Sequence, residues 1–184
     1  MGIYVELKAP WFHEREGLDI AAIVLPILYR YGYRGREDKC FVQCFDPYCL
    51  KRMRYLMRTR LRLVQLIADN SWNETPGVDY AAMLSRQGLE AVSRYADGIG
   101  PWIPQLVRID DKGRPCSTGV VARAHALGLL VHPYTARADA LPEWAPSMDF
   151  LLETMFRKLH VDGIFSDFPD LAADYLAKKR LRAR

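Results

Sequence analysis

Three segments decide the fold that this sequence predicts: Ala96-Asp97-Gly98-Ile99-Gly100-Pro101, Val131-His132-Pro133-Tyr134-Thr135 and Asp162-Gly163-Ile164-Phe165-Ser166-Asp167-Phe168-Pro169. Each begins as a short apolar strand and ends in polar or aromatic residues beside a glycine or a proline. A helical stretch follows each of them. In parallel βα barrels the chemistry lies at the carboxyl ends of the strands. The three segments therefore predict the working rim of such a barrel.

Strand and helix patterns alternate along the rest of the chain, which favours a parallel sheet. The six strands that we predict are 3–7, 39–45, 61–67, 97–100, 129–133 and 163–166. The helices that we predict are 19–31, one that Asp46 caps with Pro47 at its first position, 80–95, 119–127, 148–159 and one from Pro169 onward. The long loops all follow strands, as expected when one face of a barrel carries the function.

The predicted fold class is α/β, a partial TIM-type (β/α) barrel in a single domain over residues 1–184. A full barrel of eight units typically needs about 250 residues. The sequence also opens inside a strand pattern, Gly2-Ile3-Tyr4-Val5-Glu6. We therefore expect a truncated barrel domain whose amino-terminal strands are missing.

The composition is that of an ordinary globular protein, with 50% apolar and 26% charged residues. We find no apolar run long enough for a membrane span and no signal-peptide pattern at the start. The net charge of +4 depends on five basic residues within Lys178–Arg184, without which it is −1. This tail is either the solvated end of the last helix or a segment that is attracted to anionic lipid or nucleic acid. We expect no nucleic-acid partner.

Cys40, Cys44, Cys49 and Cys116 lack metal-ligand spacing, and we expect buried or half-buried thiols.

Glu6 and Lys8 are the first candidates for chemistry, because they alternate with Val5 and Leu7 and so share one face at a strand end. A carboxylate and an ammonium group at a barrel rim can hold a cation and a phosphate. The alternative is a half-exposed strand with a solvated face.

Four further candidates lie on other predicted strands or directly after one. Gln43 and Phe45 share one face, where Gln43 could hydrogen-bond a polyol and Phe45 could form an apolar wall beside that polyol. Core packing with a satisfied amide is the alternative. His132 at its strand end is either a structural hydrogen-bond donor or a base. Asp167 either caps the last helix or faces the rim.

Seven blocks resemble one known family, the periplasmic type of bacterial glycerophosphodiester phosphodiesterase. They follow the order of that family over essentially the whole chain. The blocks are Glu6-Leu7-Lys8-Ala9-Pro10-Trp11-Phe12-His13, Gln43-Cys44-Phe45-Asp46, Leu63-Val64-Gln65-Leu66-Ile67, Trp72-Asn73-Glu74-Thr75, Tyr95-Ala96-Asp97-Gly98-Ile99-Gly100-Pro101, Val131-His132-Pro133-Tyr134-Thr135 and Phe165-Ser166-Asp167-Phe168-Pro169-Asp170.

The resemblance implies a TIM-type barrel that hydrolyses glycerophosphodiesters to glycerol 3-phosphate and an alcohol, with a divalent cation that is usually Ca²⁺. It assigns a metal-ligand role to Glu6 and places Lys8 near the phosphate. It places Gln43, Phe45, His132 and Phe165 along the substrate pocket. It also implies a periplasmic or exported protein that belongs to glycerol and lipid metabolism.

The family's His-Arg-Gly motif, its two further acidic metal ligands and its His-Asp motif are not found in this sequence. The histidines of those motifs do the acid and base work, so no catalytic residue is identified here. The resemblance is thus to the carboxyl-terminal part of the barrel, and we expect little or no activity from this chain alone. The alternatives are a non-enzymatic remnant, a half-barrel that pairs with a separate amino-terminal fragment, or a phosphate-binding module that uses Lys8.

Overall fold

The computed structural model describes residues 2–179 and divides the chain into two compact units, Met1–Ile99 and Gly100–Arg184. The two units are described separately below. Residues 180–184 of the basic tail lie outside the described residues. The single domain over residues 1–184 stays a prediction.

The fold is α/β, as the sequence predicts. The strands are β1 (Ile3–Glu6), β2 (Cys40–Cys44), β3 (Arg62–Ile67), β4 (Gly98–Pro101), β5 (Val107–Ile109), β6 (Pro115–Ser117) and β7 (Leu130–Val131). The helices are α1 (Pro10–Arg15), α2 (Ile20–Arg30), α3 (Pro47–Tyr55), α4 (Tyr80–Met83), α5 (Arg86–Ser93), α6 (Val120–Ala126), α7 (Met148–Leu152) and α8 (Pro169–Lys178). Short turns η1 (Asn70–Trp72) and η2 (Ile103–Gln105) and the π-helical η3 (Glu153–Lys158) complete the list. None of the helices in the described part of the chain is long and apolar enough to span a bilayer.

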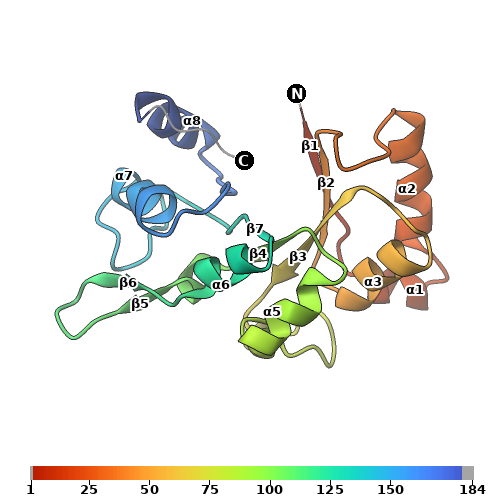
Figure 1. The fold of residues 1–184 in the computed structure, drawn as a ribbon, viewed down its shortest axis with the longest axis horizontal. Coiled ribbons are helices and arrows are strands. Elements are labelled where there is room, and N and C mark those ends of the chain that lie inside the picture. Colours follow the sequence, from red (N-terminus) through yellow and green to blue (C-terminus); the bar gives the residue numbers. More distant parts are fainter. Residues whose placement is uncertain (1, 180–184) are drawn as a thin grey trace. The chain divides into compact units, whose positions relative to one another are not determined.

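The first unit is built on parallel strands in the order β1-β2-β3-β4. The register pairs Glu6 with Gln43 and Gln43 with Val64, so these residues share one face. The opposite face carries Cys44 and Gln65, which are fully buried. Helices α2 and α3 lie beside these strands (Figure 1). The sheet thus separates a helix-covered face from the face that carries Glu6 and Gln43.

Aspartates begin both long helices of the first unit. Asp19 caps α2 by accepting the N–H of Ala22, and Asp46 caps α3 by accepting those of Tyr48 and Cys49. Pro47 occupies the first turn of α3, as predicted. Asp19 also accepts a two-pronged hydrogen bond from the guanidinium group of Arg52 on α3, which ties the two helices together.

Three sequence-based expectations about this unit and the next are wrong in detail. The helix expected over 80–95 is two helices, because Ser85 interrupts it and caps α5 through the N–H of Gly88. No helix was predicted over Pro10–Arg15, where the structure has α1, which contains His13. The charged loop around Asp110 joins β5 and β6, an antiparallel hairpin that we did not predict (Figure 1).

The second unit does not contain the sixth strand that we expected over 163–166. Isolated parallel bridges join Trp102 to Tyr134 and Ala136 to Ser166 in its place. Pro133 lies in the middle of the neighbouring segment and has no N–H to donate to a ladder. Its carbonyl still accepts the N–H of Phe165 at 2.9 Å, so the two segments run together without forming a regular strand pair.

An Asp-Gly-Ile motif occurs once in each unit, and its aspartate does the same work in both. Asp97 Oδ2 accepts the N–H of Leu63 at 2.9 Å, and Asp162 Oδ2 accepts the N–H of Val131 at 2.9 Å. Each carboxylate therefore binds a backbone N–H of the preceding strand, at Leu63 near the start of β3 and at Val131 in β7. Each is also paired with a basic side chain from the helix before that strand, Arg54 from α3 or His125 from α6.

Candidate functional site

Glu6 ends β1 and lies between two other predicted site residues. Its Oε1 is 3.2 Å from Nζ of Lys8, and Nε2 of Gln43 donates to its Oε2 at 3.4 Å. The Lys8 side chain is 80% exposed and that of Glu6 is 25% exposed, whereas Gln43 is buried. The structure therefore brings together the three polar residues predicted for the first unit, with a cationic group at the solvent side.

The amide oxygen of Gln43 is buried and has no hydrogen-bond partner within the described residues. A buried acceptor of this kind costs free energy unless a donor reaches it. Gln43 lies at the end of β2 beside Glu6. The arrangement offers an acceptor for a ligand hydroxyl, next to the ammonium group of Lys8, which suits a phosphate.

Phe45, the fourth predicted site residue, follows β2 and is fixed through its backbone. Its carbonyl accepts the side-chain amide of Gln65 at 2.8 Å and the hydroxyl of Tyr80 at 3.2 Å. Its ring meets that of Tyr80 edge-on, with 6.3 Å between centroids. Burial raises the pKa of Tyr80 to about 12, so the hydroxyl keeps its proton and donates. The backbone of Phe45 is thus fixed by two hydrogen bonds, and its ring is packed against that of Tyr80.

Trp11 in α1 joins the segment after β1 to the loop after β3. Its indole N–H donates to the backbone carbonyl of Glu74 at 2.9 Å, across 63 positions of sequence. Arg15 stacks over the indole ring at 5.2 Å. Between Lys8 and α1, Ala9 adopts a left-handed conformation with φ of 41°. This turn and the Trp11 contact fix the path of the chain immediately after Lys8.

The other two predicted site residues, His132 and Phe165, lie in the second unit. His132 follows β7, is buried, and packs its ring against the backbone of Gly163. Phe165 donates its N–H to Pro133 next to it. The unit therefore places His132 and Phe165 on neighbouring parallel segments.

Asp167 does not cap the last helix, which was one of the two alternatives. Its carboxylate pairs with Arg137 at 3.0 Å, and the N–H of Phe168 is accepted by the hydroxyl of Ser166.

The residues that the structure describes do not make up a complete cation site. Ca²⁺ takes six to eight oxygen ligands. Glu6 offers one carboxylate, and that carboxylate is paired with Lys8. No group of three or more His, Cys, Asp or Glu residues suited to a metal ion is found in the part of the chain that the structure describes.

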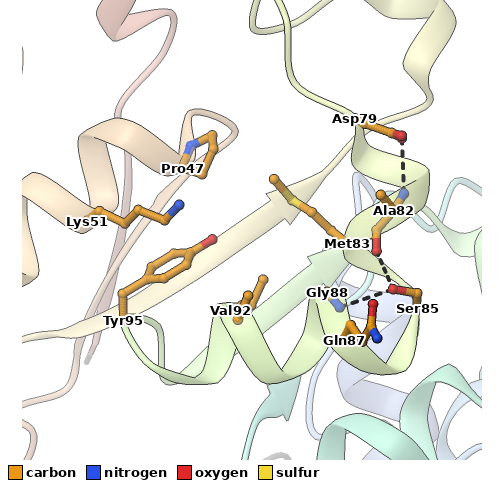
Figure 2. A pocket seen from close by; sticks show the side chains of 11 residues that line it. Pro47, Lys51, Asp79, Ala82, Met83, Ser85, Gln87, Gly88, Val92 and Tyr95 are labelled. Carbon is orange, nitrogen blue, oxygen red and sulfur yellow. Dashed lines mark hydrogen bonds between the residues drawn. The ribbon is translucent and has the colours of Figure 1, made fainter.

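A separate groove of about 320 Å³ lies on the helix-covered side of the first unit. Figure 2 shows it between the start of α3, the α4–α5 turn and Tyr95. The hydroxyl of Tyr95 donates to Gln65, which faces away from Glu6. The groove holds none of the predicted site residues and belongs to the outer surface of the helix layer.

Sequence reasoning missed several residues that support the site. The Trp11–Glu74 contact and the contact between Gly163 and His132 join residues far apart in sequence, and no local pattern shows them. The repeated Asp-Gly-Ile motif was a usable signal, because its two copies do the same work.

These features define an α/β protein of barrel type with a polar site at the carboxyl ends of its parallel strands. Residues 1–171 match the Glycerophosphoryl diester phosphodiesterase family, and the chain belongs to it. The periplasmic type expected from the sequence is a finer statement than this match supports.

Curated relatives named glycerophosphodiester phosphodiesterase agree with this assignment. The chain is 37% identical to the one from Haemophilus influenzae, over 96% of this chain and 52% of the relative. It is 33% identical to that from Treponema pallidum, over 97% and 54%. The chain thus spans about half the length of the curated relatives it matches.

Solved structures show the same fold over nearly the whole chain. A glycerophosphodiester phosphodiesterase from Parabacteroides distasonis matches with a TM-score of 0.64 and 17% identity, over 97% of this chain and 58% of that one. A phosphodiesterase from Oleispira antarctica, solved in complex with its product sn-glycerol 3-phosphate, matches with a TM-score of 0.62 and 13% identity, over 96% and 56%. The expectation of a partial TIM-type fold is confirmed.

Proposed function

We propose that this chain is the glycerol phosphate-binding part of a glycerophosphodiester phosphodiesterase, an enzyme that hydrolyses glycerophosphodiesters to glycerol 3-phosphate and an alcohol with a divalent cation. The observation that carries the proposal is the cluster of Glu6, Lys8 and Gln43 at the carboxyl ends of β1 and β2. Support also comes from the relatives' names and from the product bound to the Oleispira antarctica protein.

The cluster suits one phosphate and one polyol. The ammonium group of Lys8 is exposed and can neutralise a phosphoryl oxygen. The buried amide oxygen of Gln43 can accept a hydrogen bond from a glycerol hydroxyl. Phe45 supplies an apolar wall whose backbone is fixed. In the second unit, His132 and Phe165 are proposed as substrate-binding residues.

The hydrolytic step itself requires an acid for the leaving alcohol and a base for the attacking water. None of the residues near Glu6 is assigned either role, and the cation site is incomplete within the described residues. We therefore propose that the chain by itself binds the glycerol phosphate part of the substrate and turns it over slowly or not at all.

A half-barrel that pairs with a separate amino-terminal fragment is the second candidate. In the strand order of the first unit β1 lies at the edge, and that edge carries Glu6. The exposed N–H and C=O groups of an edge strand can pair with another chain. The matched relatives are about twice as long as this chain. Calcium as the cation and export to the periplasm remain proposals from the family resemblance.

Release of glycerol 3-phosphate from a glycerophosphodiester, measured with calcium present, tests the first proposal. We expect no turnover by this chain, ready turnover by the Haemophilus influenzae relative, and binding of glycerol 3-phosphate by this chain in calorimetry. If this chain turns over substrate as fast as the relative, the proposal that the chain alone is inactive is wrong. If this chain does not bind glycerol 3-phosphate, the proposed binding site is wrong. The second candidate predicts activity when the part of that relative that this chain does not cover is added as a separate chain.

A further inference from the structure

The ring of His132 lies against the backbone of Gly163, where a side chain would otherwise stand. A Cβ atom built on Gly163 would be 3.0 Å from Cδ2 of His132, 3.4 Å from Nε2 and 3.6 Å from Cγ. The first distance is well inside ordinary van der Waals contact. Cδ2 of the imidazole ring would therefore have to move by a few tenths of an ångström to admit alanine, whereas Nε2 and Cγ stand at ordinary contact distances.

The backbone on both sides of this contact is fixed by hydrogen bonds. Asp162 donates its N–H to Val131 at 3.0 Å and accepts the N–H of Val131 at 2.9 Å through its carboxylate. Phe165 donates to Pro133 at 2.9 Å. These bonds bracket His132 on one segment and Gly163 on the other. A side chain at 163 would therefore displace the imidazole ring rather than the backbone.

Conformational freedom is not the reason for glycine at this position. Gly163 is not among the glycines with positive φ, so its backbone conformation is open to alanine. The obstacle to a larger residue is the histidine ring itself.

We infer that Gly163 is a positioning residue, which sets the direction in which His132 presents its ring to the substrate. The inference rests on the proposed function, because it takes His132 as a substrate-binding residue. A shift of the ring by a few tenths of an ångström weakens hydrogen bonds that depend on its direction.

The test compares Gly163→Ala with Gly35→Ala in the full chain. Gly35 is a matched control, because its Cβ would meet nothing within 4 Å and its φ is not positive. The ring resonances of His132, assigned in NMR spectra by their loss in His132→Gln, should shift in G163A and stay in place in G35A. The dissociation constant for sn-glycerol 3-phosphate should rise roughly threefold to tenfold in G163A alone.

A double-mutant comparison shows whether the effect passes through the ring. In a His132→Ala background, the added G163A change should leave the dissociation constant unaltered. Unshifted His132 resonances in G163A, or equal weakening of binding in the H132A background, would overturn the inference. If G163A does not fold, recovery of the fold in the double variant supports the inference, and failure to recover overturns it.

The two proposals fail in different ways. If the unaltered chain binds no sn-glycerol 3-phosphate, the proposed function fails. The His132 resonances in G163A then still decide whether Gly163 positions the ring.

Discussion

Asp162 and His125 are joined by a contact of 2.8 Å between Oδ2 and Nε2, and the same carboxylate oxygen receives the N–H of Val131. Asp97 repeats this arrangement in the first unit, where its partner is Arg54 at 2.6 Å. Arg36 adds a second contact to Asp97 at 2.7 Å. The basic partner therefore differs between the two copies: a guanidinium group keeps its charge, whereas an imidazole ring can be neutral.

This difference predicts unequal costs for Asp97→Asn and Asp162→Asn. The first change leaves Arg54, whose side chain is 15% exposed, charged and without its carboxylate. We expect the free energy of unfolding to fall by about 3–5 kcal/mol. The second change leaves the side chain of His125, which is 36% exposed and so partly hydrated, and we expect a loss of about 1–3 kcal/mol. Urea unfolding of both variants measures the difference, and equal losses would contradict the argument.

The hydrogen bonds of Gln65 predict a large loss of stability when this residue is replaced by leucine. Its amide donates to the carbonyls of Phe45 and Leu66, both at 2.8 Å, and its oxygen accepts the hydroxyl of Tyr95 at 2.8 Å. Gln65→Leu leaves these buried groups without that partner, and we expect a loss of roughly 2–4 kcal/mol. Tyr95→Phe removes one of the contacts and should cost about 1 kcal/mol. Thermal and urea unfolding compare the two, and the idea fails if Q65L is as stable as the unaltered chain.

The close packing around Gly88 predicts that alanine at this position destabilises α5, although alanine normally stabilises a helix interior. Alanine is normally better than glycine there, by about 1 kcal/mol. In this chain the added Cβ would collide with the carbonyl of Ala82 and lie 2.5 Å from Cα of Met83, so α4 and α5 would have to separate. We expect Gly88→Ala to cost roughly 1–3 kcal/mol, and Gly35→Ala to be close to neutral. A melting temperature for G88A at or above that of G35A is the contrary result.

Asp19 predicts a loss of stability in acid. The guanidinium group of Arg52 lowers the pKa of Asp19 from 3.8 to about 2 in the folded chain. The unfolded chain therefore takes up this proton at a higher pH, and the contribution of the pair is present above pH 3.8 and is lost as the pH falls toward 2. The stability difference between the unaltered chain and Asp19→Asn should be constant near neutral pH and shrink below about pH 4. A stability difference at pH 2 as large as the one near neutral pH would rule this out.

Lys8 predicts the anion dependence of the site. In the absence of divalent cations, Lys8→Ala should weaken binding of glycerol 3-phosphate, and Glu6→Gln should tighten it by removing a negative charge 3.2 Å from the ammonium group. Lys51→Ala is the matched control, because Lys51 lines the groove on the helix-covered side. Calorimetry measures all three, and tighter binding in K8A would disprove the role of Lys8.

Local signals account for the parts of the fold that the sequence predicts well. Asp19, Asp46 and Pro47 act within one helical turn, so the starts of α2 and α3 are readable from a few residues. Period-two alternation within a strand predicts that Glu6 shares a face with Lys8, whereas the pairing of β1 with β2 is what places Glu6 beside Gln43. The missing sixth strand was also readable in part, because Pro133 interrupts the donors that a regular strand pair needs.

Contacts over long sequence distances account for the rest. Arg54 and Asp97 are 43 positions apart, and nothing near either residue indicates its partner. The break between α4 and α5 depends on how closely Gly88 approaches Ala82, which is a matter of packing. Periodicity alone therefore joins these two helices into one.

The indole of Trp11 gives this chain a built-in optical probe. Because its N–H reaches across to the backbone at Glu74, any event that parts those two loops changes the polarity around one fluorophore. In a form of the chain with Trp72, Trp102 and Trp144 replaced by phenylalanine, Trp11 is the remaining tryptophan. The emission wavelength of that form would report whether a ligand bound at Glu6, Lys8 and Gln43 keeps the Trp11–Glu74 contact or breaks it.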